Sequence, residues 1–173
     1  MPKTLILIPS RMAATRLPGK PLLKINNLSI ISHVVKKAKK TKIGRVIVCT
    51  EDQLILDDVI KNGGEAILTR NSHKSGTDRI FEAYKKLNIK NVDYILNLQG
   101  DEPAIDENDI INLNNMMIKT NSNIGTMGAE IKNQNFFSNE NIVKVKTKEK
   151  LNDKNFSLAL SFQRNHVLKE KKN

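Results

Sequence analysis

A basic segment near the start of the chain combines residue types that could bind phosphate groups. Arg11, Arg16 and Lys20 lie within residues 8–22, where three prolines and a glycine favour tight turns. Backbone amides of such a loop, together with the three cations, could hold a triphosphate and neutralise the charge on a departing pyrophosphate. An exposed basic loop that binds nothing is the alternative that composition alone favours. The segment contains neither Gly-x-x-x-x-Gly-Lys-Ser/Thr nor Gly-x-Gly-x-x-Gly, so it predicts a different kind of phosphate-binding loop.

A carboxylate follows an apolar run further along the chain. Asp101 comes after residues 94–98, with Gly100 before it and Glu102 after it. A carboxylate at the end of a strand could hold a hard cation that bridges phosphates, which makes Asp101 a candidate Mg²⁺ ligand. Magnesium often takes only one or two protein carboxylates and completes its coordination with water and phosphate oxygens. A solvated turn residue is the alternative.

Residues 69–79 are dense in hydrogen-bond donors and acceptors, which would suit recognition of a base or a sugar. A helix start is the competing interpretation. In that interpretation Thr77 or Asp78 caps the helix, and Arg79 pairs with an acid such as Glu82 on the same helix.

Apolar patterning predicts the elements that would position these residues. Apolar patterning predicts strands over residues 5–8, 46–49, 66–68 and 94–98, and the first two are continuous runs typical of strands buried on both faces. Helical spacing predicts helices over residues 30–38 (capped by Ser29 and broken by Gly44), 51–60, 78–87 and 105–118. This alternation predicts an α/β fold with a mostly parallel, Rossmann-like sheet and helices on both faces. The loops after the first, third and fourth strands should meet at the carboxyl edge, where ligands bind in such sheets.

The pattern changes beyond residue 120. Residues 124–129 and 142–147 are predicted to be strands, the second one half exposed because apolar and basic residues alternate in it. Residues 156–162 could pair antiparallel with the second strand and form a C-terminal β-hairpin. Residues 168–173 are charged, and we expect them to fray.

Length, charge and composition narrow the classes of function that the chain could have. A length of 173 residues predicts one domain with a substantial core. The net charge is +11 and residues 1–50 contain no Asp or Glu, which suggests an anionic small molecule, a nucleic acid or a solvated face. Nucleic-acid binding is the weaker alternative, because aromatic residues make up only 4% and no reader motif is present. The lone Cys49 and the lack of a membrane-length apolar stretch favour a cytoplasmic protein that does not insert into membranes.

Four stretches, in this order, resemble the 3-deoxy-manno-octulosonate (Kdo) cytidylyltransferase family, also called CMP-Kdo synthetases. They are Ile8-Pro-Ser-Arg-Met-Ala-Ala-Thr-Arg-Leu-Pro-Gly-Lys-Pro-Leu22, then Thr69-Arg70 with His73 and Ser75-Gly-Thr-Asp-Arg79, then Asn97-Leu-Gln-Gly-Asp-Glu-Pro103, and a shorter block, Asn139-Glu-Asn-Ile-Val-Lys-Val145. Ser10 and Ala14 stand where the family usually has Ala and Ser. Sialic acid cytidylyltransferases are the nearest alternative, but Thr15-Arg-Leu-Pro-Gly-Lys20 favours Kdo.

The resemblance implies a nucleotidyltransferase-type fold and a magnesium-dependent enzyme. The implied enzyme joins CTP and Kdo into CMP-Kdo and releases pyrophosphate, in lipopolysaccharide biosynthesis. The implied site residues are Ser10, Arg11, Arg16 and Lys20 for the phosphates, Arg70, Ser75, Gly76 and Gln99 for the cytidine, and Asp101 for magnesium. Arg11, Lys20 and Asp101 would be the catalytic residues, because they would stabilise the extra charge of the transition state.

Members of this family continue past the end of this chain, and their continuation contributes a second metal-binding Asp, much of the sugar pocket and part of the dimer surface. We therefore expect a single domain in which residues 1–120 form the nucleotide-binding core. Residues 121–173 would form an incomplete sugar-binding and dimerisation part. Two functions stay open: an active enzyme, which could be a homodimer, and a truncated, catalytically impaired remnant that binds CTP.

Overall fold

A computed structural model describes residues 3–13, 17–133, 135–152 and 155–164. The chain divides into two compact units, Met1–Ile118 and Lys119–Asn173, which are described separately below. None of the helices in these described ranges is long and apolar enough to cross a membrane.

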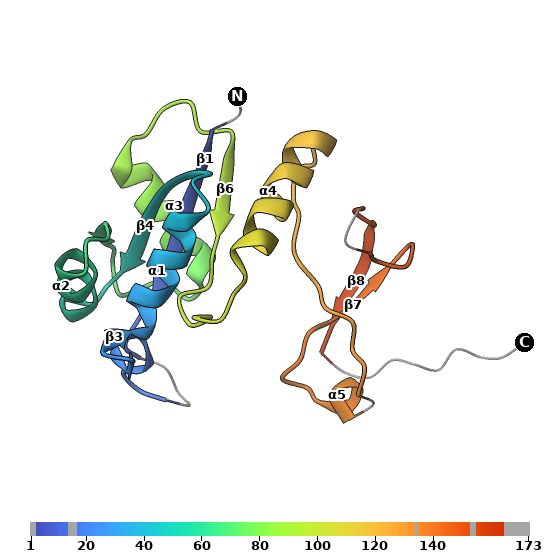
Figure 1. Ribbon diagram of the computed structural model, residues 1–173, viewed down its shortest axis with the longest axis horizontal. Helices are drawn as coiled ribbons and strands as arrows, with labels where there is room; N and C mark the ends of the chain where they lie inside the picture. The colour runs from blue at the N-terminus through green and yellow to red at the C-terminus, as the bar shows by residue number, and fades with distance from the viewer. Residues whose placement is uncertain (1–2, 14–16, 134, 153–154, 165–173) are drawn as a thin grey trace, which may run out of the picture. The chain divides into compact units, whose positions relative to one another are not determined.

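A four-stranded parallel sheet forms the centre of the first unit (Figure 1). Its strands, in spatial order, are β5 (Ala66–Leu68), β4 (Gly44–Thr50), β1 (Thr4–Ser10) and β6 (Tyr94–Asn97). The central strand β1 pairs in parallel with both neighbours, so that Thr4 lies opposite Gly44 on one side and Tyr94 on the other. This arrangement confirms the predicted α/β fold with its parallel, Rossmann-like sheet.

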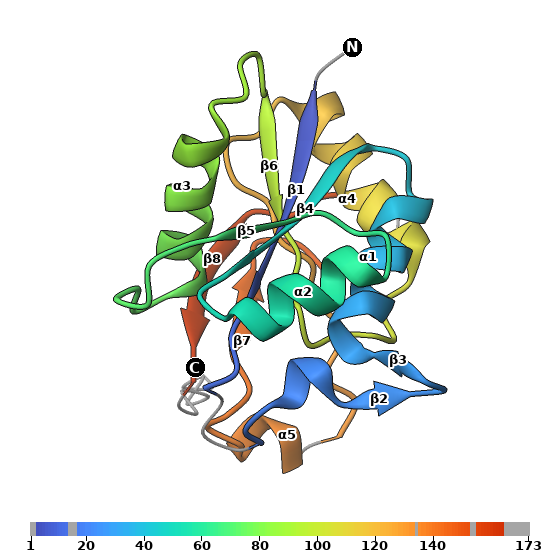
Figure 2. The same ribbon diagram turned by 90° about the vertical axis from the view of Figure 1, so that its left-hand side faces the viewer.

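Helices cover both faces of this sheet, as predicted (Figure 2). Successive side chains of a strand point to opposite faces. Ile6 and Ile8 therefore enter one buried cluster, to which α1 (Ile30–Lys40), α2 (Gln53–Lys61) and α4 (Glu107–Thr120) also contribute. Leu5 and Leu7 enter a second cluster with Ile80 and Ala83 of α3 (Gly76–Leu87). Burial on both faces explains the continuous apolar runs of the central strands.

The predicted cap of α3 and the predicted break of α1 are wrong. The N-cap of α3 is Ser75, not Thr77 or Asp78, because the Ser75 hydroxyl accepts a hydrogen bond of 3.1 Å from the Asp78 amide and starts the helix earlier. The helix α1 ends at Lys40, whereas Gly44 begins strand β4. A Cβ at Gly44 would lie 1.9 Å from the carbonyl oxygen of Thr4, so only glycine permits this close approach of the two strands. The predicted Ser29 cap of α1 is confirmed, since its side chain accepts from the Ser32 amide.

The connection between β1 and α1 contains regular structure that was not predicted. It contains the 3₁₀ helix η1 (Lys20–Leu22) and a two-stranded antiparallel ribbon of β2 (Lys24–Ile25) and β3 (Leu28–Ser29). Asn26 and Asn27 form the turn of this ribbon with φ angles of 47° and 63°, which asparagine tolerates better than most residues. The ribbon leads the chain from the basic loop into α1.

The second unit contains α5 (Asn135–Ser138) and an antiparallel hairpin of β7 (Lys144–Thr147) and β8 (Ala159–Gln163). Val145 lies opposite Phe162, which confirms the predicted C-terminal hairpin. The predicted strand over residues 124–129 is wrong, because the segment pairs with no strand of the described residues, and Ile124 is 91% exposed. The expected fraying of residues 168–173 falls outside the described residues.

Candidate active site

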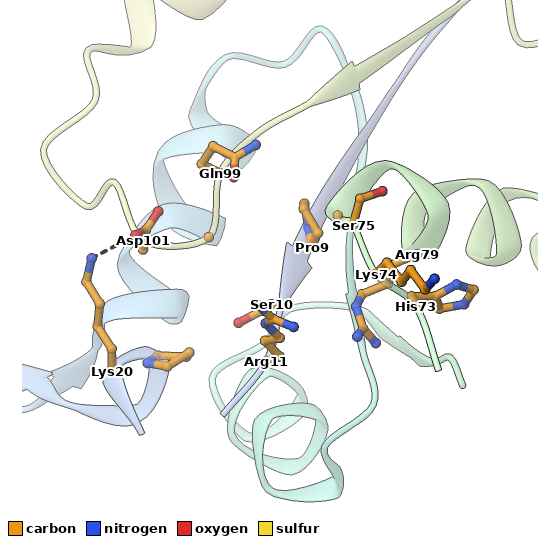
Figure 3. A pocket seen from close by; sticks show the side chains of 13 residues that line it. Pro9, Ser10, Arg11, Lys20, His73, Lys74, Ser75, Arg79, Gln99 and Asp101 are labelled. Carbon is orange, nitrogen blue, oxygen red and sulfur yellow. Dashed lines mark hydrogen bonds and ion pairs between the residues drawn. The ribbon is translucent and has the colours of Figure 1, made fainter. Parts of the chain in front are cut away.

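The carboxyl edge of the sheet carries a pocket of about 340 Å³ in the first unit (Figure 3). Three segments surround it, and they follow β1, β5 and β6, as the sequence predicted. The lining residues are Pro9, Ser10, Arg11, Lys20, Pro21, His73, Lys74, Ser75, Gly76, Arg79, Gln99, Gly100 and Asp101.

Most of the predicted site residues meet in this pocket. The structure brings together Ser10, Arg11, Lys20, Ser75, Gly76, Gln99 and Asp101. Arg70 does not line this pocket; its exposed side chain lies near Glu82 on α3. Arg16 lies outside the described residues. Sequence reasoning did not place His73 and Arg79 in the site, although both belong to the quoted motif.

Glycines allow the three loops to approach one another. A Cβ at Gly76 would lie 3.1 Å from the Pro9 ring, and a Cβ at Gly100 would lie 2.9 Å from the Pro9 carbonyl oxygen. In the basic loop, the amide of Gly19 donates to the Met12 carbonyl at 3.0 Å, with Gly19 at a φ of 73°. The loop is thereby closed, and Lys20 returns toward the end of β1.

Lys20 and Asp101, which both line the pocket, form an ion pair. The Lys20 Nζ and the Asp101 Oδ2 are 2.7 Å apart, and the side chains are 33% and 54% exposed, respectively. The predicted phosphate-binding cation and the predicted metal-binding carboxylate thus neutralise each other in this structure. Because the pair is open to solvent, it should be weak and replaceable by a ligand.

Ser10 offers a second feature of a binding site. It ends β1 beside the pocket and is 8% exposed, and its Oγ is buried without a hydrogen-bond partner among the described residues. A buried hydroxyl without a partner is unfavourable, and a ligand oxygen or nitrogen in the pocket could satisfy it.

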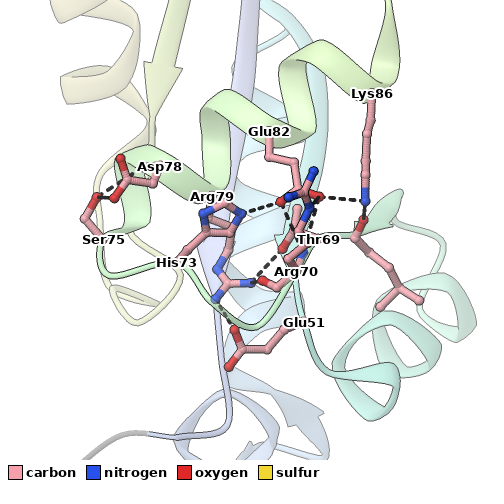
Figure 4. A network of polar contacts seen from close by, with 10 residues as sticks. Glu51, Thr69, Arg70, His73, Ser75, Asp78, Arg79, Glu82 and Lys86 are labelled. Atoms are coloured by element: carbon pink, nitrogen blue, oxygen red, sulfur yellow. Dashed lines mark hydrogen bonds and ion pairs between the residues drawn. The ribbon is translucent and has the colours of Figure 1, made fainter.

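Arg79 is buried at the back of the site, with 3% exposure (Figure 4). The expected pairing of Arg79 with Glu82 is wrong, because Arg79 turns toward the sheet, whereas Glu82, one turn further, lies beside residues 70–73. The Arg79 guanidinium pairs with Glu51, which follows β4, and donates to the Thr69 Oγ1 at 2.6 Å. It therefore ties the ends of two strands to the start of α3.

The Glu82 carboxylate accepts hydrogen bonds from residues of the neighbouring loop and from its own helix. Lys86 Nζ donates to it at 2.7 Å, His73 Nε2 donates to its other oxygen, and the Arg70 amide also donates to the carboxylate. The hydrogen bond from Lys86, followed by those from His73 and Arg70, lowers the pKa of Glu82 to about 2. Glu82 is therefore ionised at neutral pH and acts only as an acceptor.

The acidic side chains suit a magnesium ion that is held mainly by its substrate. No group of three or more His, Cys, Asp or Glu side chains is placed to hold a metal within the described ranges. Asp101 presents a half-exposed carboxylate to the pocket, which fits an ion that takes one protein carboxylate and several phosphate or water oxygens. Cys49 lies in the sheet, and burial raises the pKa of its thiol to about 12, so it supplies no thiolate at neutral pH.

Known proteins are similar to this chain in sequence. The family model described as cytidylyltransferase matches residues 5–172. A 3-deoxy-manno-octulosonate cytidylyltransferase of Nitrobacter winogradskyi is 47% identical over 144 residues, which are 83% of this chain and 57% of the relative. Another, of Thermodesulfovibrio yellowstonii, is 44% identical over 170 residues, which are 95% of this chain and 64% of the relative.

Solved structures agree with the sequence relatives. A CMP:2-keto-3-deoxy-manno-octonic acid synthetase complexed with CTP superposes with a TM-score of 0.80 at 32% identity, over 98% of this chain and 67% of that one. A cytidylyltransferase of Leptospira borgpetersenii gives a TM-score of 0.60 at 30% identity, over 72% and 52% of the two chains. The fold and the sequence matches show that this chain belongs to the cytidylyltransferase family. It spans 57% to 64% of the length of the curated relatives named above.

Proposed function

We propose that this chain transfers a cytidylyl group from CTP to Kdo, forming CMP-Kdo and pyrophosphate for lipopolysaccharide biosynthesis. The observation that carries the proposal is the pocket in which the cations Arg11 and Lys20 meet the carboxylate of Asp101. The similarity to a synthetase that holds CTP supports the choice of nucleotide, and the names of the curated relatives support the choice of sugar.

The proposed roles divide the pocket into a phosphate side and a base side. Phosphates would contact the hydroxyl of Ser10 and the cations of the basic loop; the proposed residues are Ser10, Arg11, Arg16 and Lys20. The cytidine would lie against the segments after β5 and β6; the proposed residues are Arg70, Ser75, Gly76 and Gln99. Asp101 would hold Mg²⁺, which when bound supplies positive charge to the phosphates.

The reaction needs charge stabilisation more than acid–base chemistry. The anomeric hydroxyl oxygen of Kdo attacks the α-phosphorus and forms a new P–O bond. The bond between the α-phosphorus and the bridging oxygen breaks, and its electron pair leaves with pyrophosphate, while the hydroxyl proton passes to solvent. Lys20 and Arg11 would bind the phosphates and neutralise the charge that develops on them. Lys20 must first leave Asp101 to do so.

A second candidate is a protein that binds CTP without turnover. It is favoured by the ion pair between Lys20 and Asp101, because the proposed catalytic cation and the proposed metal ligand contact each other in this structure. We place either function in the cytoplasm, where CTP is available and a lone buried Cys49 remains reduced. Assembly into a homodimer is part of the proposal for the active enzyme.

Pyrophosphate release tests the first candidate. The chain is incubated with CTP, Kdo and Mg²⁺, and release is compared with reactions that lack Kdo. We expect release that depends on Kdo and on Mg²⁺ and that falls strongly in Asp101→Asn. CTP binding by calorimetry without any release, even at high protein concentration, would favour the binding function. An absence of both would contradict both candidates.

A further inference from the structure

The segment between β5 and α3, residues 69–75, forms one wall of the pocket and is neither helix nor strand. Its first amide, that of Thr69, donates to the Thr50 carbonyl at 2.7 Å and prolongs the pairing of β5 with β4. At its other end, Ser75 caps α3. Between these points, side chains of α3 contact the segment, so its shape depends on them.

Arg79 holds the first half of this segment. Its guanidinium donates to the Thr69 hydroxyl at 2.6 Å and to the Arg70 carbonyl at 3.4 Å, and it pairs with Glu51. The Arg79 side chain is 4% exposed and the Glu51 side chain 16% exposed. Burying a guanidinium is unfavourable unless its partners are well placed, so these contacts fix the geometry around Thr69 closely.

Glu82 holds the second half. Its carboxylate accepts from the Arg70 amide at 3.2 Å and from His73 Nε2, and its side chain is 11% exposed. Lys86 keeps the carboxylate in place from the following turn. Glu82 is not among the residues that line the pocket, so any effect it has on a ligand must act through the segment it holds.

Both anchors come from a rigid part of the fold. Arg79 and Glu82 are three residues apart on α3, which places them on neighbouring positions of one helical face. Ile80 and Ala83, between and beside them, are 5% and 0% exposed in the core against the sheet. The helix therefore presents two fixed charged groups to a segment that lacks regular structure (Figure 4).

We propose that Arg79 and Glu82 are positioning residues that set base selectivity by holding residues 69–75 against the nucleobase; this inference rests on the proposed function. Cytosine and uracil differ only at one ring edge, in the donor and acceptor groups they present. Discriminating them requires polar groups held in place to a fraction of an ångström. The anchors supply that rigidity to the segment in which His73, Lys74 and Ser75 line the pocket.

Two variants test the anchors separately. Glu82→Gln removes the negative charge that holds the second half, with little change in shape. Thr69→Val removes the hydroxyl that accepts from Arg79, also with little change in shape, and leaves Arg79 in place. Glu65→Gln is the matched control, because Glu65 pairs with Arg45 at the surface with both side chains about half exposed. Thermal unfolding of each variant shows whether it is folded before binding is measured.

Equilibrium titrations with CTP, UTP and pyrophosphate give the readout. We expect Glu82→Gln and Thr69→Val to weaken CTP binding by about tenfold and to reduce the CTP-to-UTP preference by a similar factor. Pyrophosphate, which should contact only the phosphate side, should bind within about twofold of the wild type. Faster amide hydrogen exchange at residues 70–73 of the free variants should accompany the loss of selectivity. Glu65→Gln should behave as the wild type in every titration.

The results that would contradict the inference differ from those that would contradict the proposed function. Unchanged CTP-to-UTP preference in both variants would overturn the inference while leaving the proposed function intact. An equal loss of CTP and pyrophosphate binding would mean that the anchors support the whole site, which also overturns it. A wild-type chain that binds none of the three ligands would contradict the proposed function and the inference together.

Discussion

The two sides of the pocket are held in different ways. On one side, Arg79 and Glu82 hold residues 69–75 with side chains that are 4% and 11% exposed. On the other side, Lys20 and Asp101 form an ion pair with side chains that are 33% and 54% exposed. Figure 3 shows Lys20 and Asp101 on the opposite side of the pocket from His73 and Arg79. The contacts of the buried side are already in place, whereas Lys20 and Asp101 would have to separate before the proposed ligands could contact them.

The largest effect should come from the exposed side, where charge would develop in the proposed reaction. Lys20→Met should lower the rate of pyrophosphate release by about 10² to 10³-fold, because a cation that stabilises the transition state is lost. The Michaelis constant for CTP should change much less. Steady-state kinetics measure both, and Lys24→Met, at an exposed position in β2, is the control. Equal losses in the two variants would show that general positive charge, rather than Lys20, carries the effect.

The second-largest effect should come from the contacts of Arg79 on the buried side. It should appear as a lower free energy of unfolding. Arg79→Lys should lower the free energy of unfolding by about 3 kcal/mol, because a lysine cannot reproduce the guanidinium's contacts and leaves Glu51 or Thr69 without a partner. Denaturant unfolding measures the change. Arg45→Lys is the control, since Arg45 pairs with Glu65 at an exposed position and should cost less than about 1 kcal/mol. Similar losses in both variants would remove the contrast between buried and exposed contacts.

Removal of the Asp101 carboxylate should have a smaller effect. Without metal, it should strengthen CTP binding rather than weaken it. Asp101→Asn should tighten CTP binding about two- to fivefold when metal is removed with a chelator, because Lys20 is then free for the phosphates. With Mg²⁺ present, the same variant should bind CTP more weakly than the wild type. Glu102→Gln changes the charge by the same amount at the neighbouring exposed position. Metal-free tightening of the same size in Glu102→Gln would show that net charge alone explains the result.

The smallest effect should come from Ser10. Ser10→Ala removes a buried hydroxyl that has no partner in the described structure, so the free energy of unfolding should stay the same or rise by up to about 1 kcal/mol. CTP binding should weaken by a few fold, because a hydrogen bond to the ligand is lost. Unfolding and calorimetric titration measure the two quantities. A clear loss of stability would mean that the hydroxyl has a partner in the free protein.

The apolar patterns in the sequence predicted the strands of the central sheet better than the structure of the segments outside it. The runs at β1 and β4 are apolar on both faces, which identifies buried parallel strands without knowledge of their neighbours. The same reasoning failed for residues 124–129, because a strand forms only when a partner is available, and sequence does not show whether one is. The short β2–β3 ribbon was missed because two-residue strands leave no pattern.

The site was predicted in part because its residues follow strands. Lys20 and Asp101 are 81 positions apart, and nothing local in either segment indicates their ion pair. Arg79 was assigned to Glu82 because a helical spacing of three residues makes that pairing plausible. The structure shows a different partner: the mostly buried guanidinium of Arg79 pairs with Glu51, which follows the end of another strand. The partner of a buried charge is set by tertiary packing, which local spacing does not encode.

Equilibrium titration of the chain with CTP in the presence of Mg²⁺ tests the central claim most directly, because both candidate functions require it. The account predicts saturable binding of one CTP per chain, weakened at least tenfold when Arg11 and Lys20 are replaced together by Met and unaffected by Lys24→Met. Failure of the wild-type chain to bind CTP, or equal binding by the double variant, would contradict the assignment of this pocket to the nucleotide.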